Sequence, residues 1–268
     1  MRHALYVPPF GTFGDVALLV ELAQAAEEAG WDGFFLWDHI HFETAVPFVD
    51  PWIALTAMAA ATERLRLGPL ITPLPRRRPW KVAREAVTLD HLSAGRLVLG
   101  VGLGIDFWHE FDGFAEPATD DHLRAELLDD GIEIITRLWS GETVSYAGRR
   151  LRVDGVRFLP VPVQRPRIPI WSAVLWPPRA NPIRRAARCD GVVPFNPAGM
   201  TPEQVVDLRA RIGAARADDS PYDICLHGPP ALAREFADVG VTWYMESLLP
   251  DEPVAEVWRV VGEGPPDL

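Results

Sequence analysis

Eight short apolar segments of this 268-residue chain alternate with segments whose apolar residues recur at helical spacing. The predicted strands cover residues 3–7, 33–37, 65–71, 96–102, 168–172, 191–194, 222–226 and 241–245. The predicted helices between them cover residues 15–29, 51–62, 80–92, 120–139, 179–188, 202–213 and 230–238. This alternation predicts an α/β protein with a (β/α)8 TIM barrel, and a doubly wound open sheet is the alternative.

Residues 142–167 interrupt the alternation. Two β-type segments, 143–146 and 150–153, flank Ala147-Gly148, and a proline-rich stretch follows them. A hairpin of this kind predicts an excursion on the surface and not a domain boundary. We therefore expect one domain over residues 1–262, with residues 263–268 as a flexible tail.

Charge and cysteine content exclude several classes of partner. The net charge of −11 and the pI near 5.1 would repel nucleic acid and anionic membrane surfaces. Pro8 and Pro9 interrupt the apolar N-terminus, and no segment approaches the length of a membrane span. Cys189 and Cys225 are far apart and belong to no CxxC pair, so the sequence predicts a cytoplasmic protein with no metal site.

Lys81 is the single lysine of the chain. It falls in the predicted helix 80–92 and not at the end of a predicted strand. Aldolases that form a Schiff base, and hydrolases whose metals share a carbamylated lysine, place a lysine at a strand end of the barrel. The sequence therefore argues against both uses of this scaffold.

Asp38 and His39 directly follow the predicted strand 33–37. Parallel α/β proteins keep their chemistry at the carboxyl ends of the strands, which form the mouth of a barrel. An acid and an imidazole at this place predict a functional site. The alternatives are that Asp38 caps the next segment and His39 is a loop residue, or that both bind a metal together with His41.

Four segments together resemble the luciferase-like monooxygenase family of flavin- and deazaflavin-dependent oxidoreductases. They are residues 26–39 (AEEAGWDG through DH), 64–73 (RLRLGPLITP), 83–96 (AREAVTLDHLSAGR) and 99–102 (LGVG). Their order and spacing carry the resemblance, which spans roughly residues 1–195 of the chain. It implies a (β/α)8 barrel that binds a flavin-type ring at its mouth and acts on a small organic substrate by hydride transfer or by oxygenation.

The resemblance implies coenzyme F420 or FMN as the cofactor. In the FMN branch, dioxygen would react and a flavin reductase would be a partner. His39 would be the general acid/base beside the ring, with its tautomer set by Asp38. Family members are commonly dimers, so we expect a homodimer.

The resemblance also assigns residues to cofactor binding. The first group would hold the ring: a non-prolyl cis peptide at Leu70–Ile71 would support it, and glycines would let it approach the backbone. This group consists of Leu70, Ile71, Thr72, Gly100 and Gly102. The second group lies in and after the segment expected to bind the cofactor phosphate: Ser172, Ala173, Arg179, Asp190 and Gly191. Between Ser172 and Arg179 the chain has no glycine.

Two other functions stay open at this point. A non-catalytic flavin-binding barrel is compatible with the glycine-free phosphate loop. A metal-dependent hydrolase would use Asp38, His39 and His41. In the branch that oxidises alcohols or sugar phosphates an acid often follows the Gly-x-Gly segment, where this chain has Leu103. The substrate depends on the mouth loops, above all on residues 104–118.

Overall fold

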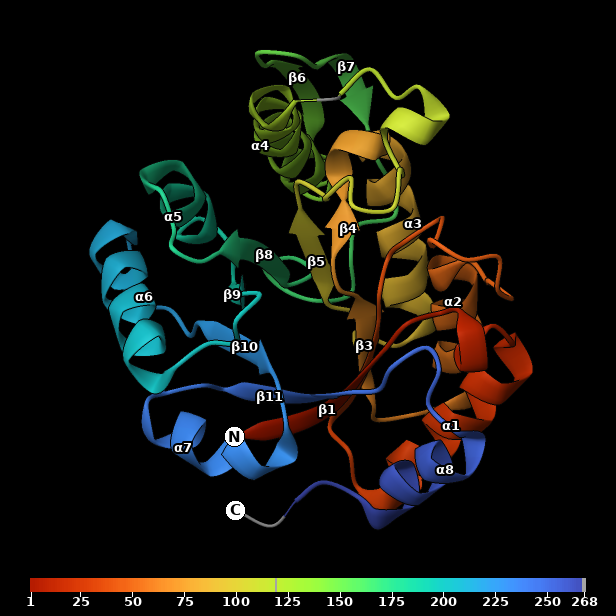
Figure 1. Cartoon of the computed structure of the whole chain (residues 1–268). Helices are drawn as coiled ribbons and strands as arrows, with labels where there is room; N and C mark the ends of the chain where they lie inside the picture. Colours follow the sequence, from red (N-terminus) through yellow and green to blue (C-terminus); the bar gives the residue numbers. More distant parts are fainter. Residues whose placement is uncertain (119, 267–268) are drawn as a thin grey trace.

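The computed structural model describes residues 1–118 and 120–266 of the chain. Its main sheet contains parallel strands in the order β3-β2-β1-β11-β10-β9-β8-β5-β4, with helices on the outside (Figure 1). The strands are β1 (Arg2–Val7), β2 (Gly33–Leu36), β3 (Arg66–Pro69), β4 (Thr72–Pro73), β5 (Leu99–Gly102), β8 (Ile170–Leu175), β9 (Gly191–Phe195), β10 (Asp223–His227) and β11 (Trp243–Ser247).

The nine segments make eight barrel strands, because β3 and β4 are two parts of one barrel strand that is interrupted at Leu70–Ile71. The sheet closes where Leu67 of β3 pairs with Leu97, just before β5. The predicted (β/α)8 barrel is therefore confirmed, and the open-sheet alternative is wrong. The predicted strand 65–71 needs correction, since it is interrupted at Leu70–Ile71 and continues to Pro73, and the bounds of other strands differ by a few residues.

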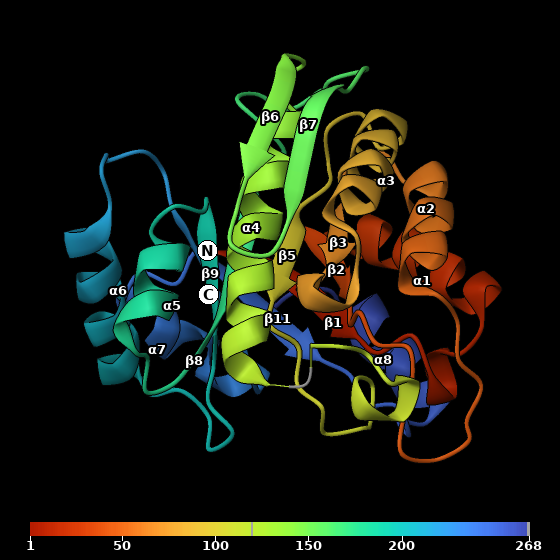
Figure 2. The same cartoon turned by 90° about the horizontal axis from the view of Figure 1, so that it is seen from above.

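The helices surround the barrel (Figures 1 and 2). They are α1 (Val16–Ala29), α2 (Pro51–Ala61), α3 (Pro79–Leu92), α4 (Asp121–Leu138), α5 (Ala180–Ala186), α6 (Pro202–Ala215), α7 (Ala233–Asp238) and α8 (Val254–Glu263). Short 3-10 turns lie at η1 (Gly11–Phe13), η2 (Leu74–Arg76), η3 (Asp112–Phe114) and η4 (Pro230–Leu232). Among the described residues, no helix combines the length and apolar character needed to cross a bilayer.

Helix ends follow the expected local chemistry. The Asp15 side chain accepts a hydrogen bond from the Ala17 amide at the start of α1, and Gly30 ends that helix in the left-handed conformation, with φ of +92°. Helix α8 was not predicted from the sequence. It packs on α1, and its Val261 carbonyl oxygen accepts a hydrogen bond from Trp31 Nε1. This helix extends to Glu263, where the tail was predicted to begin.

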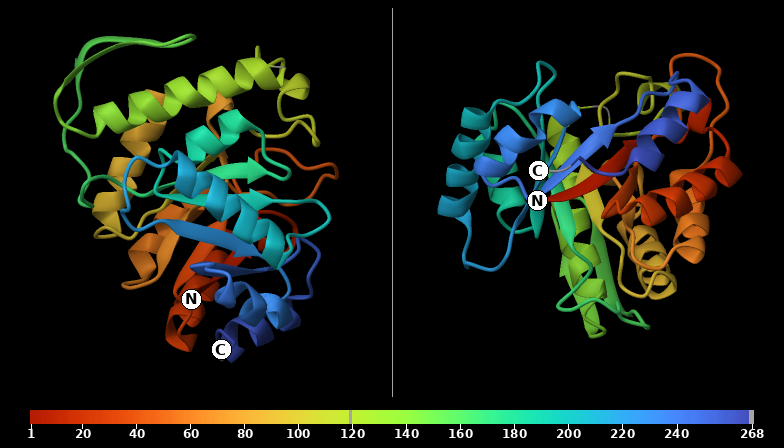
Figure 3. Two further views of the ribbon diagram at one scale, coloured as in Figure 1. Left: turned by 90° about the vertical axis from the view of Figure 1, so that its left-hand side faces the viewer. Right: turned by 90° about the horizontal axis from the view of Figure 1, so that it is seen from below.

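The predicted excursion is a hairpin of β6 (Thr143–Ala147) and β7 (Arg152–Arg157) beside α4 (Figures 2 and 3). Its second strand starts later than predicted, because the Asp130 carboxylate of α4 accepts hydrogen bonds from the amides of residues 149–151. These amides therefore bind the Asp130 carboxylate in the turn instead of pairing with β6.

Aromatic side chains fill the barrel at the amino ends of its strands. Phe35, Trp171 and Trp243 are buried there with ring centroids 5.5 to 5.8 Å apart. A Cβ atom at Gly191 would lie 2.5 Å from the Trp171 ring, so this glycine makes room for the tryptophan. The packed amino end leaves the carboxyl end of the strands as the place for a ligand.

Arg96 connects the segment before β5 to α2. Its buried guanidinium donates hydrogen bonds to the carbonyl oxygens of Ala59, Thr62 and Leu65 and to the Thr62 hydroxyl. An ammonium group offers no comparable planar set of donors. Arg96 therefore fixes the end of α2 against the barrel.

We expect Arg96→Lys to lower the free energy of unfolding by about 2 to 4 kcal/mol, because several buried carbonyl groups lose their donors. Chemical denaturation of both proteins measures this difference. Arg137→Lys, in the exposed pair with Glu133, is the matched control and should change stability by less than about 0.5 kcal/mol. Equal stability of the Arg96 variant and the wild type would refute this role.

Candidate functional site

Aromatic and small polar side chains line the mouth of the barrel. The cluster inside the barrel includes one residue from each of five strands: Ala4, Phe35, Val193, Cys225 and Met245. Side chains alternate between the two faces of a strand, so the residue two positions later also points into the barrel. These later residues, here named the mouth wall, are Tyr6, Trp37, Phe195, His227 and Ser247. Neighbouring rings of the wall have centroids 5.5 Å (Trp37 to Tyr6), 5.5 Å (Tyr6 to His227) and 6.2 Å (His227 to Phe195) apart.

His39 lies beside this wall and is paired with an acid. Its Nδ1 atom is 2.8 Å from Oε2 of Glu110, and its ring centroid lies 4.6 Å from that of Trp108 and 6.1 Å from that of Trp37. The Ile40 amide donates a hydrogen bond of 2.6 Å to Oε1 of Glu110. The loop after β5 thus folds onto the loop after β2 and buries the Glu110 carboxylate, which is 1% exposed.

The surroundings of Glu110 keep it ionised. Burial alone raises the pKa of this carboxyl, but the hydrogen bond and charge of His39, the Arg76 guanidinium and the Ile40 amide outweigh burial and hold the pKa below its usual value. Arg76 Nη1 lies 3.0 Å from Oε1, and its side chain is 5% exposed. An ionised Glu110 only accepts hydrogen bonds, so His39 donates from Nδ1 and keeps Nε2 for other partners.

Asp38 does not orient His39. Its buried carboxylate accepts hydrogen bonds from Trp52 Nε1 at 2.8 Å, from the Thr72 hydroxyl at 2.7 Å and from Arg77 at 3.3 Å. The prediction that Asp38 sets the His39 tautomer is therefore wrong, because successive residues point in different directions at the end of β2. Asp38 instead holds α2 and β4 together behind the site.

Sequence reasoning missed Glu110. The position directly after Gly102, where one branch of the family often has an acid, holds Leu103 in this chain. The acid that reaches the mouth stands seven residues later. An acid between Trp108 and Phe111, in a loop otherwise rich in apolar residues, was the available signal for a buried carboxylate.

The histidines and acids near the mouth do not converge on a common point. His41 Nδ1 donates to the carbonyl oxygen of Trp108 at 2.8 Å, while His39 and Asp38 have the separate partners described above. Over residues 1–118 and 120–266, no three His, Cys, Asp or Glu side chains are arranged to hold a metal ion. The donor geometry therefore gives the metal-dependent hydrolase no support.

The bulge between β3 and β4 has the predicted form. The Leu70–Ile71 peptide is cis, which confirms the expectation, and Tyr6 Oη donates a hydrogen bond of 2.8 Å to the carbonyl oxygen of Leu70. Cβ atoms at Gly100 and Gly102 would lie 2.3 Å from the Leu70 side chain and 2.6 Å from the Ile71 side chain. These glycines thus make room for the side chains of the bulge, while the approach of a ring to their backbone stays a prediction.

The residues predicted to bind the cofactor phosphate divide between the two ends of the barrel. Ala173 faces the interior, since Trp171 does, whereas Ser172 faces the helices and its buried hydroxyl has no hydrogen-bond partner in the described part of the chain. Arg179 precedes α5 at the mouth.

Asp190 and Gly191 begin β9 and lie at the opposite end of the barrel, where the Asp190 carboxylate accepts a hydrogen bond from the Ile170 amide. Their assignment to a ligand at the mouth is wrong. The Asp-Gly pair marks the start of the strand, and the segment that follows a helix always reaches the amino end of the barrel.

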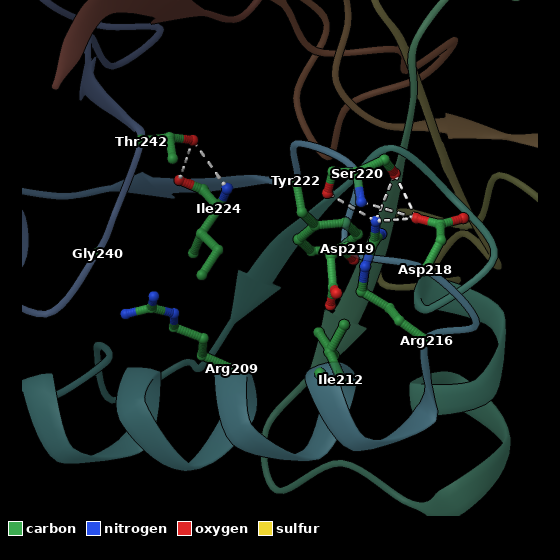
Figure 4. Close-up of a pocket in the computed structure, with 11 residues that line it drawn as sticks. Arg209, Ile212, Arg216, Asp218, Asp219, Ser220, Tyr222, Ile224, Gly240 and Thr242 are labelled. Atoms are coloured by element: carbon green, nitrogen blue, oxygen red, sulfur yellow. Dashed lines mark hydrogen bonds and ion pairs between the residues drawn. The ribbon is translucent and has the colours of Figure 1, made fainter.

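Two cavities, of about 360 and 460 Å³, lie at the amino end of the strands and not near His39. Figure 4 shows the first, where Arg216 donates hydrogen bonds to Asp218 and Ser220 below the start of β10. The second is lined by Arg2, Arg66 and the acids near α1. The amino end of a barrel is usually a place of structural contacts, and these charged side chains fit that use.

Comparison with known proteins identifies the family. The profile described as luciferase-like monooxygenase matches residues 7–245. An F420-dependent glucose-6-phosphate dehydrogenase of Nakamurella multipartita is 36% identical over 141 residues, which are 51% of this chain and 40% of that protein. The chain spans about half the length of the curated relatives of this kind that it matches.

Two solved structures share the fold over nearly the whole chain. An F420-dependent secondary alcohol dehydrogenase in complex with an F420-acetone adduct has a TM-score of 0.80, with 16% identity and coverage of 98% and 97% of the two chains. The monooxygenase RslO1 from Streptomyces bottropensis has a TM-score of 0.79, with 23% identity and coverage of 97% and 96%. The family profile, supported by the barrel and its cis peptide, shows that this chain belongs to the luciferase-like monooxygenase family.

Proposed function

We propose that this protein is an F420-dependent oxidoreductase that acts on a small organic substrate at the mouth of the barrel. The observation that carries the proposal is the pairing of half-buried His39 with buried Glu110, which presents an imidazole of defined tautomer beside the aromatic mouth wall. An imidazole exchanges protons near neutral pH, which a reaction between an alcohol and a carbonyl compound requires.

The residues of the mouth fit a flat ring with hydrogen-bond acceptors. Trp37 Nε1 is buried and has no hydrogen-bond partner among the described residues, so an acceptor on a bound ring would satisfy it. The bulge at Leu70–Ile71, held by Tyr6, would support one face of the ring. Arg179 would reach the phosphate of the cofactor.

The protein's part in the reaction is proton transfer and positioning. A bound deazaflavin supplies two-electron hydride chemistry. His39 Nε2 would take the proton of a substrate hydroxyl group, or return it to a carbonyl oxygen, while the Glu110 anion stabilises the charged imidazolium. Trp37 and Trp108 flank the imidazole and would exclude water from it.

FMN is the alternative cofactor. It would make the protein a monooxygenase with a flavin reductase as partner, as the fold shared with monooxygenase structures allows. A barrel that binds either ring without turnover is a further alternative. A homodimer is our expectation from the resemblance alone.

Equilibrium binding of oxidised and reduced F420 and FMN to the purified protein tests the proposal. We expect F420 to bind and to change the tryptophan fluorescence, because Trp37 and Trp108 adjoin the site. Preference for reduced FMN would instead favour oxygenation. If neither cofactor bound, the chemistry proposed here would be refuted and only the fold would be shared.

A further inference from the structure

We infer that the substrate is uncharged and largely apolar, with an alcohol or carbonyl as its reacting group, unlike the phosphorylated sugar named for the Nakamurella relative. This inference rests on the proposed function, because it concerns the same site. It follows from the side chains around the mouth and from the distribution of charge among its loops.

Exposed apolar side chains surround the mouth. Their exposed fractions range from 41% for Phe195 to 74% for Phe107, and they lie in the segments that follow β2, β5 and β11 or are the last residues of β8 and β9. This apolar rim consists of Ile40, Ile105, Phe107, Phe114, Leu175 and Leu249, together with Phe195, which is also part of the mouth wall. Large exposed apolar side chains gathered at one end of a protein usually mark a binding site.

The mouth wall inside this rim is neutral. Tyr6, Trp37 and Phe195 present rings, and Ser247 presents a hydroxyl 3.3 Å from Nδ1 of His227. Burial lowers the pKa of His227, so this histidine is neutral at physiological pH. Apart from the Tyr6 hydroxyl, which is bound to Leu70, and Trp37 Nε1, which is assigned above to the cofactor ring, the wall offers ring faces and the polar groups of His227 and Ser247. These suit a hydrocarbon skeleton better than a polyhydroxylated sugar.

The loops of the mouth carry few positive charges. Taken together, the loops between a strand and the following helix contain four arginines, no lysine and eleven Asp and Glu residues. Two of the arginines are bound to acids: Arg76 contacts Glu110 at 3.0 Å, and Arg77 contacts Asp38 at 3.3 Å and Glu85 at 2.7 Å. These two charges are neutralised within the protein.

The other two arginines of these loops have different neighbours. The Arg78 guanidinium lies 5.9 Å from the ring centre of Trp80, at the start of α3, and Arg179 is the residue proposed for the cofactor phosphate. A second phosphate, on the substrate, would therefore enter an acidic mouth without a cation of its own. An uncharged substrate avoids this repulsion.

Tryptophan fluorescence with matched ligands tests the inference, with and without F420. The probes are the apolar ketones cyclohexanone and 4-phenyl-2-butanone and the charged sugar glucose 6-phosphate. We expect 4-phenyl-2-butanone to bind most tightly and glucose 6-phosphate not to bind. Phe195→Glu should weaken ketone binding about tenfold or more, because it removes an apolar contact and adds a charge. Val206→Glu, at a half-exposed position on α6, is the control and should change nothing.

Failure of the inferred substrate class and failure of the proposed function give different results. Tighter binding of glucose 6-phosphate than of both ketones, in protein that also binds F420, would overturn the inference and leave the proposed function intact. Ketone binding that Phe195→Glu does not alter, or no ketone binding at all, would also overturn it. If ketones bound at Phe195 while F420 and FMN did not bind, the apolar site would stand and the proposed function would fail.

Discussion

Replacing His39 with asparagine is expected to lower turnover about 10²- to 10⁴-fold, which is the usual contribution of a positioned general acid or base. Asparagine keeps a polar group of similar size next to Glu110 but cannot exchange a proton near neutral pH. Binding of F420 should persist, because the bulge at Leu70–Ile71 and Arg179 remain in place. The loss should therefore appear in kcat rather than in cofactor affinity.

Steady-state kinetics and F420 titration of the same preparations measure both effects. His122→Asn is the matched control, since His122 is exposed on α4 and its substitution should leave both quantities unchanged. Full turnover by the His39 variant with cofactor bound would show that another group moves the proton.

Glu110→Gln is expected to lower the free energy of unfolding at neutral pH by about 3 kcal/mol. The variant leaves the guanidinium of Arg76, which is 5% exposed, beside a neutral amide in place of a carboxylate. It also replaces the carboxylate, which can only accept and so fixes the His39 tautomer, by an amide that can donate as well as accept. Turnover should fall, and its pH dependence should shift, while Glu110→Asp should restore part of both.

The pH dependence of stability follows from the lowered pKa of Glu110 in the folded protein. A carboxyl group with a lower pKa in the folded than in the unfolded state stabilises the fold above its unfolded pKa, and this contribution is lost as the pH falls through the folded value. The difference in stability between wild type and Glu110→Gln should therefore be largest near neutral pH and shrink under acidic conditions.

Urea denaturation at several pH values measures this difference. The control is Asp112→Asn, in the same loop, where an exposed carboxylate pairs with His109. We expect this substitution to change stability by less than about 1 kcal/mol at any pH. A difference for Glu110→Gln that stayed constant from neutral to acidic pH would contradict a stabilising charge on Glu110.

Local signals predicted most of the fold. Short apolar runs, proline at the first turn of α2 and Gly30 after α1 depend on neighbouring residues, and the structure confirms them. The failures concern features set by distant contacts. The β6–β7 turn depends on Asp130 of α4, and the interruption between β3 and β4 depends on the packing of Leu70 and Ile71 against Gly100 and Gly102.

In the candidate site, too, features set by neighbouring residues could be predicted and features set by distant contacts could not. Asp38 and His39 could be placed at the mouth because they follow a predicted strand directly. Their partners could not be predicted, because Glu110 reaches His39 only when the loop of residues 103–118 folds across the neighbouring loop. Asp190 and Gly191 were misplaced, because the resemblance grouped them with a loop that lies at the other end of the barrel.

A crystal structure of the complex with F420 tests the central claim most directly, since it shows where the ring lies. We predict the ring at the carboxyl ends of the strands, between the bulge at Leu70–Ile71 and His39. F420 bound in one of the cavities at the amino ends of the strands, away from His39 and Glu110, would contradict the proposed site and the chemistry assigned to it.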